Sequence, residues 1–127
     1  MYKRQGLEQG RENCCYIHVV LVPYISGSDE YKSKPAQHSV KELQGMGVSP
    51  DIIILRADGS VGSDIRRKIS TFCNVKPECV IENLTMPSLY QCPLMLHTNG
   101  LDDVVVQQLH LDGPPVSYTH LVRVLSV

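Results

Sequence analysis

The chain has 127 residues, of which 43% are hydrophobic and 20% are charged, the composition of one ordinary globular domain with a real core. The formal net charge of −1 argues against broad nucleic-acid binding, which depends on a basic surface. No apolar run reaches the roughly 18 residues of a membrane span and no signal-peptide pattern opens the chain, so we expect a cytoplasmic protein without membrane contact. The five cysteines have no CxxC spacing, which favours reduced packing residues over a zinc site.

The first expected elements precede residue 24. Residues 1–5 show no periodicity, and residues 6–13 resemble the tail of a helix. Residues 16–22 form a nearly continuous apolar run rich in β-branched residues, which predicts a strand covered on both faces and ended by Pro23. We interpret His18, inside this run, as a hydrogen-bonded core or edge histidine.

A doubly basic segment, Lys-Ser-Lys-Pro-Ala-Gln-His-Ser, occupies residues 32–39. Alternate side chains of an extended segment leave on the same side, so Lys32 and Lys34 are predicted to converge about 7 Å apart. The following proline favours an extended Lys34, and Ser39 with Glu42 has the pattern of a capping box that starts a helix. Because a helix N-terminus favours anions, the segment indicates a polyphosphate site. A solvated basic loop is the alternative that the residue types leave open.

A helix is predicted from Val40 to about Met46, ended by Gly47, and a second buried strand over residues 52–56. A loop with two glycines then leads to a helix over residues 64–72, in which apolar residues repeat at helical spacing: Ile65, Ile69 and Phe72. This helix carries three consecutive basic residues: Arg66, Arg67 and Lys68. Successive helix residues point about 100° apart, so at least one of the three should be solvated.

The rest of the pattern predicts a short strand over residues 79–81, a helix opened by Ser88 and closed by Gly100, and a last helix over residues 101–110. Apolar strands that alternate with helices predict an α/β fold, a three-layer parallel sheet with flanking helices. Ligands of such sheets bind beyond the carboxyl ends of the strands, where residues 32–37 are expected.

Several active-site patterns are absent from the sequence. It contains no GxxxxGK[ST] phosphate loop, no GxSxG elbow and no HExxH helix. Asp102 and Asp103 form an adjacent acidic pair, which more often marks a solvated helix start than a metal site. We therefore predict no catalytic residue and no metal ligand in this chain.

Six segments together resemble CTP synthase: Tyr16-Ile17-His18, Leu21-Val22-Pro23-Tyr24, Glu30 to Leu43, Pro50-Asp51-Ile52-Ile53, Phe72-Cys73-Asn74-Val75 and Ser88-Leu89-Tyr90. The KxKPxQHSVKEL stretch within the third is the most specific. The resemblance covers residues 6–112 and matches the second, C-terminal half of the family's synthetase (amidoligase) domain. It implies an incomplete part of a P-loop NTPase-like, dethiobiotin-synthetase-like fold.

The resemblance also implies a function. The family makes CTP from UTP, ATP and glutamine: ATP phosphorylates the uracil oxygen at C4, and ammonia from a separate glutaminase domain displaces that phosphate. Residues that match its contacts to UTP, and to CTP as feedback inhibitor, are Lys32, Ser33, Lys34, Pro35, Ala36, Gln37 and Lys68. The backbone of Leu84, Thr85 and Met86 matches the contact to the ATP base. In the family the UTP site forms across a homotetramer interface.

The sequence departs from the family at two of these places. Ser33 and Ala36 stand where threonine is usual, and Ala36 lacks the hydroxyl. Thr85-Met86-Pro87 replaces a usual Asp-Val-Asp, which weakens the ATP assignment.

The family's phosphate loop and magnesium-binding acids match no residue here, and neither does its glutaminase Cys-His-Glu triad. We therefore expect a fragment that is inactive alone, with ATP and Mg²⁺ bound in the full enzyme. Residues 1–5 and 113–127 resemble translated sequencing-adapter sequence, and we expect both to be artefactual. Two alternatives stay open: a stand-alone α/β nucleotide-binding or regulatory module without catalysis, and a piece too short to fold.

Overall fold

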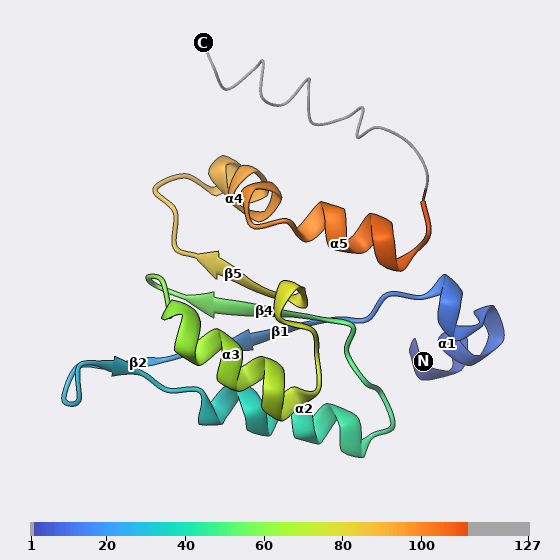
Figure 1. The fold of residues 1–127 in the computed structure, drawn as a ribbon, viewed down its shortest axis with the longest axis horizontal. Helices are drawn as coiled ribbons and strands as arrows, with labels where there is room; N and C mark the ends of the chain where they lie inside the picture. The colour runs from blue at the N-terminus through green and yellow to red at the C-terminus, as the bar shows by residue number, and fades with distance from the viewer. Residues whose placement is uncertain (1, 112–127) are drawn as a thin grey trace, which may run out of the picture.

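A computed structural model of the chain describes residues 2–111 (Figure 1). Its centre is a parallel sheet with the strand order β1-β4-β5, formed by β1 (Ile17–Leu21), β4 (Ile52–Ala57) and β5 (Val80–Leu84). Ile17 pairs with Ile52, and Ile53 pairs with Val80. The predicted α/β class with a parallel sheet and flanking helices is confirmed.

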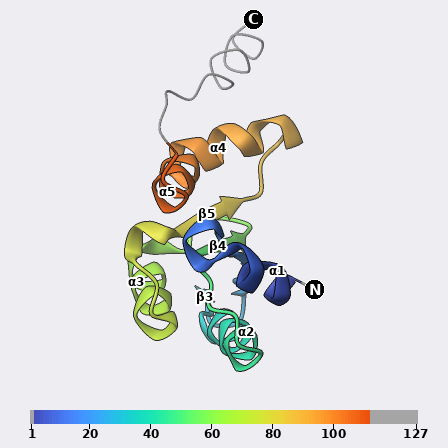
Figure 2. The same ribbon diagram turned by 90° about the vertical axis from the view of Figure 1, so that its right-hand side faces the viewer.

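Helices cover the two faces of the sheet (Figures 1 and 2). On one face lie α2 (Lys34–Gly45) and α3 (Gly62–Cys73), and on the other lie α4 (Cys92–Thr98) and α5 (Leu101–Gln108). Each helix pair closes over its own apolar cluster, as a sheet between two helical layers requires.

The larger cluster lies between the sheet and the α2–α3 layer. Its buried members include Val40, Ile53, Leu55, Ile69 and Val80. The second cluster consists of Ile52, Ile54 and Ile81 on the opposite face, where α4 and α5 pack their apolar side chains: Leu96, Leu101, Val104 and Val105. Strand β4 therefore buries both of its faces, as its continuous apolar run predicted.

Strand β1 differs from the prediction of a strand covered on both faces. Its alternate residues Ile17, Val19 and Leu21 are 43%, 58% and 64% exposed. In the described residues β1 pairs with β4 alone, and α4 and α5 pack over β4 and β5 but not over β1. The prediction was therefore wrong for this face, while Val20 and Val22 on the other side are buried, as expected.

The start of α2 is a further correction. The helix begins at Lys34, with Pro35 in its first turn, so Lys34 is helical and Ser39 is not the N-cap. Proline fits the first turn because the missing N–H has no partner there in any case. Ala36 and Val40, four residues apart on one side of the helix, are both buried, and this packing favours the earlier start. The helix ends as predicted, with Gly47 at positive φ just after it.

A two-stranded hairpin that the sequence analysis did not predict precedes α2. It pairs β2 (Tyr24–Ile25) with β3 (Glu30–Tyr31) in antiparallel fashion. After the hairpin the chain turns back to the start of α2, near the carboxyl ends of the strands (Figure 1).

Other helix boundaries also differ from the sequence patterns. Phe72 is 67% exposed, and Cys73 is buried in its place on α3. Ser88 opens a short 3-10 helix, Leu89–Gln91, without a side-chain cap, and α4 starts only at Cys92. The last helix, α5, begins at Leu101 as predicted.

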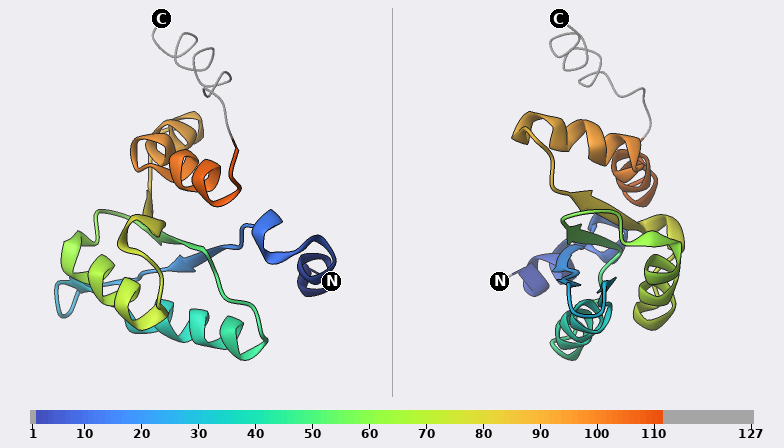
Figure 3. Two further views of the ribbon diagram at one scale, coloured as in Figure 1. Left: turned by 45° about the vertical axis from the view of Figure 1, so that its right-hand side comes forward. Right: turned by 90° about the vertical axis from the view of Figure 1, so that its left-hand side faces the viewer.

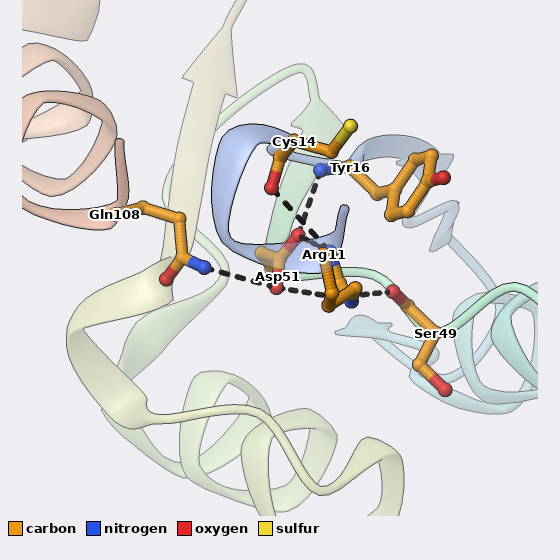
Figure 4. A network of polar contacts seen from close by, with 6 residues as sticks. All are labelled: Arg11, Cys14, Tyr16, Ser49, Asp51 and Gln108. Carbon is orange, nitrogen blue, oxygen red and sulfur yellow. Dashed lines mark hydrogen bonds and ion pairs between the residues drawn. The ribbon is translucent and has the colours of Figure 1, made fainter. Parts of the chain in front are cut away.

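The N-terminal segment comprises α1 (Tyr2–Gln9) and a 3-10 helix, Arg11–Asn13, at the end of the sheet where β1 begins (Figure 3). The helical turns thus begin earlier than residues 6–13. Asp51 fastens this segment: it accepts hydrogen bonds from Arg11 Nη2 at 2.6 Å, Arg11 Nη1 at 2.8 Å and the Tyr16 amide at 2.7 Å (Figure 4). The Asp51 hydrogen bond raises the pKa of Arg11, and its guanidinium lies over the Tyr16 ring.

The five cysteines are free thiols. Burial raises the pKa of Cys15, Cys73 and Cys79, which disfavours the reactive thiolate and agrees with a packing role. Across residues 2–111, no helix has the length and apolar character to cross a membrane.

Candidate nucleotide site

All three strands of the sheet point their carboxyl ends toward one edge (Figure 1). The β2–β3 hairpin, the first turn of α2 and the loop 58–61 before α3 gather at this edge. The predicted site residues of segment 32–37 therefore lie where open α/β sheets place their ligands.

Lys32 and Lys34 stand on either side of the point where β3 passes into α2. Lys32 is half-buried and its ammonium forms an ion pair with Glu30. Lys34 is exposed in the first turn of the helix. The first turn of α2 has no side-chain cap, so its N–H groups and the partial positive charge of the helix end lie beside both lysines.

Lys68, the third predicted lysine, lies on α3, which follows the loop 58–61. The hydrogen bond and the charge of Lys32 lower the pKa of Glu30, and Ser28 and Lys68 lower it further. Arg66, Arg67 and Lys68 are all exposed, and Arg67 pairs with Asp64 at 3.3 Å.

The other residues of the segment are placed unequally. Ser33 is buried, and its hydroxyl accepts a hydrogen bond from Gln37 Nε2 at 3.1 Å. Pro35 is exposed in the first turn of α2. Ala36 is fully buried in the core, so its methyl group faces Val40 and the sheet rather than the surface. A ligand contact at residue 36 would have to use its backbone.

The loop 58–61 joins this segment to the next strands. The Tyr31 hydroxyl accepts a hydrogen bond from the Gly59 N–H at 2.8 Å. Glu82 on β5 accepts hydrogen bonds from the Ser60 hydroxyl at 3.1 Å and from the Val61 N–H at 2.9 Å. The loop is therefore held from both sides.

The predicted ATP-base residues follow the carboxyl end of β5. Two of their amides are engaged, since the Leu84 N–H donates to Met95 Sδ at 3.3 Å and the Thr85 N–H donates to the Ala57 carbonyl at 3.1 Å. The Thr85 hydroxyl donates to Asp58 at 2.9 Å and accepts from Arg56 Nη2 at 2.9 Å. A purine base at this place would therefore have to use atoms other than these two amides.

His18 is hydrogen-bonded, as predicted, to the Ser39 hydroxyl at 2.9 Å, and burial lowers its pKa. His97 pairs with Asp102 at 2.6 Å, between α4 and α5. In the described part of the chain, no three histidine, cysteine or acidic side chains gather in a group suited to a metal ion.

A groove of about 830 Å³ lies between α1, β1 and the end of α2. Its walls include Cys15, Tyr16, Leu43 and Met46, at the amino ends of the strands. The groove therefore lies at the opposite end of the strands from the lysines, and we do not assign the nucleotide to it.

Sequence reasoning missed Glu30, Tyr31 and Gly59. A signal was present, because Tyr-Ile and Glu-Tyr flank the turn residues Ser26-Gly27-Ser28-Asp29, which is a hairpin pattern. No local signal pairs Tyr31 with Gly59, 28 residues away.

Comparisons with known proteins agree on one family. The family described as CTP synthase N-terminus matches residues 2–111. A CTP synthase of Clostridium beijerinckii is 52% identical over 119 residues, which are 94% of this chain and 22% of the relative. The CTP synthases of Clostridium kluyveri and Latilactobacillus sakei are 52% identical over 102 residues and 43% identical over 123, covering 80% and 97% of this chain and 19% and 23% of those relatives. The chain thus spans about a fifth of the length of these relatives.

Proposed function

The chain belongs to the CTP synthase family, and on that basis we propose that residues 32–37 and Lys68 bind the triphosphate of UTP, and of CTP acting as feedback inhibitor. The family match covers the N-terminal part of these proteins. The finer placement in the second half of the synthetase domain, and the artefactual origin of residues 1–5 and 113–127, remain predictions.

One observation carries this proposal: two lysines flank an uncapped helix N-terminus at the ligand-binding edge of a parallel sheet. The corrected helix start strengthens it, because the first N–H groups of α2 lie beside Lys32 and Lys34 rather than six residues farther along the chain. Lys68, exposed on α3, joins the proposal because it matches a nucleotide contact of the family. A triphosphate carries several negative charges, so three ammonium groups and a helix end suit its charge.

For the complete protein we propose the reaction of the family, ATP-dependent amination of UTP to CTP with glutamine as nitrogen donor. This chain would supply the pyrimidine nucleotide site and, through Leu84, Thr85 and Met86, part of the ATP-base site. The ligands of Mg²⁺ and the residues that transfer the phosphate would have to come from other parts of the polypeptide, since the described residues hold no suitable cluster of acidic side chains. Further proposed partners are the glutaminase domain of the same polypeptide and the other subunits of a homotetramer.

Lys68 and its neighbours provide the test. We define the restored enzyme as a full-length CTP synthase in which residues 6–112 replace the matching segment of the Clostridium beijerinckii relative. Lys68→Met keeps the aliphatic stem and removes the charge, and Arg67→Met is the control on the next position of α3, about 100° away. We expect Lys68→Met to weaken CTP binding at least about fivefold in calorimetric titration and Arg67→Met to change it less than about twofold. Equal effects would contradict the assignment of Lys68.

The isolated chain gives a second test. We expect weak or no UTP binding, because the proposed site requires other parts of the protein and neighbouring subunits. Circular dichroism would show whether the chain folds. Micromolar UTP binding by a folded monomer would contradict the need for other subunits and favour a stand-alone binding module.

A further inference from the structure

We propose that Tyr31 is a positioning residue that fixes the two lysine-bearing elements of the site relative to each other, an inference that rests on the proposed function. Its hydroxyl accepts the Gly59 N–H at 2.8 Å and so links the β3–α2 segment to the loop before α3. Tyr31 does not itself touch the nucleotide in this proposal. It acts through the lysines on both sides of the link.

The Tyr31 ring is held on two sides. It packs against the core cluster beneath α2 and α3, and its edge meets the Tyr24 ring with centroids 5.1 Å apart. The next residue is fixed as well, because the Lys32 N–H donates to the Pro23 carbonyl at 3.0 Å. The hydroxyl therefore projects from an anchored ring, and a hydrogen bond from such a group restricts its partner.

The two ends of this hydrogen bond lead directly to the lysines. On one side, Lys32 follows Tyr31 in the chain and Lys34 begins α2. On the other, Gly59 lies three residues before Gly62, where α3 begins, and α3 carries Lys68. A shift of the loop relative to β3 would thus change the separation between the lysines that must contact one triphosphate.

Gly59 supports the same inference, because the absence of a side chain lets the Tyr31 hydroxyl approach it closely. A Cβ built at this position would lie 3.0 Å from the Tyr31 hydroxyl, closer than ordinary van der Waals contact, and no other atom beyond the two neighbouring residues would lie within 4 Å. The φ angle of Gly59 is not positive, so alanine is compatible with the backbone there. The close approach of the hydroxyl is therefore the specific obstacle to a side chain at residue 59.

Tyr31→Phe in the restored enzyme removes the hydroxyl and keeps the ring. One hydrogen bond worth about 1 kcal/mol sets an upper limit of about fivefold on the loss of CTP affinity, and we expect a rise in KM for UTP of the same order. We expect the KM for glutamine to stay close to that of the parent, and the thermal midpoint to fall no more than the loss of one hydrogen bond explains. Tyr24→Phe is the matched control, because its hydroxyl bonds Asp29 within the hairpin and links no second element.

A double-mutant cycle separates positioning from general destabilisation. Gly59→Ala should weaken CTP binding in the parent, but have little effect beside Tyr31→Phe, where the atom it would meet is gone. Additive effects of Gly59→Ala and Tyr31→Phe on CTP binding would overturn the inference. Equal changes in the KM values for UTP and glutamine in Tyr31→Phe would overturn it as well. Lys34→Ala, measured in parallel, keeps the two proposals distinct. If Lys34→Ala leaves CTP binding unchanged, the proposed function fails; if it weakens binding while Tyr31→Phe does not, only the role of Tyr31 fails.

Discussion

Lys34→Ala in the restored enzyme tests the lysine site with little disturbance of the fold. Lys34 is exposed in the first turn of α2, and alanine is the best helix former, so we expect the helix to persist. Two unit charges 4 Å apart interact by about 1 kcal/mol in water and about 4 kcal/mol at an effective dielectric constant of 20. Because Lys34 is exposed, we take about 1–2 kcal/mol, which corresponds to about a 5- to 30-fold rise in the UTP requirement.

The assay compares the KM values for UTP and glutamine at fixed ATP, together with CTP affinity. Lys41→Ala is the control: it removes the same charge from an exposed position of α2, two turns and about 10 Å farther along. We expect a large rise in the KM for UTP for Lys34→Ala, little change in the KM for glutamine, and a near-parental Lys41→Ala enzyme. Equal rises for both substrates, or equal effects of the two variants, would refute the assignment.

Three further predictions concern charge and stability. Glu30→Gln removes a negative charge beside Lys32 and should tighten CTP binding about two- to fivefold at low salt, whereas Glu42→Gln, on the far part of α2, should not; weaker binding would contradict this. Asp51→Asn should lower the free energy of unfolding in urea by about 2–3 kcal/mol, because the Asp51 carboxylate is only 13% exposed and binds the Arg11 guanidinium through two hydrogen bonds. The control Asp64→Asn, at an exposed position, should lower it by less than about 0.5 kcal/mol. Similar losses in the two variants would contradict a stabilising role of Asp51. Burial lowers the pKa of His18 below its ordinary 6.5, so the unfolded state takes up the proton more readily; stability should fall as the pH drops from about 7 to 5, and His18→Gln should reduce that fall.

The sequence predicted the parts of the fold in which local pattern and packing agree. The apolar run at residues 52–56 predicted a strand buried on both faces, and the structure has one there. The helix predicted from residue 101 is also present, and its apolar side chains pack against that strand. An apolar run does not report how many neighbours a strand has, which is why the exposure of Val19 on β1 was not foreseen. At α2, two helix-start patterns competed, and the burial of Ala36 favoured the earlier one.

The site was predictable to a similar degree. The spacing of Lys32 and Lys34 beside a helix start was readable from the residues, although the expected extended geometry was wrong. Lys68 entered through the family resemblance, since helical periodicity alone does not choose among three adjacent basic residues. The hydrogen bond between Tyr31 and Gly59 depends on a hairpin and a loop that meet only in the folded chain.

The most direct measurement is a high-resolution cryo-electron microscopy map of the restored enzyme with bound CTP. We predict that the ammonium groups of Lys32, Lys34 and Lys68 lie within about 4 Å of phosphate oxygens, with the triphosphate at the start of α2. A triphosphate bound elsewhere, with these three side chains directed into solvent, would contradict the proposed site.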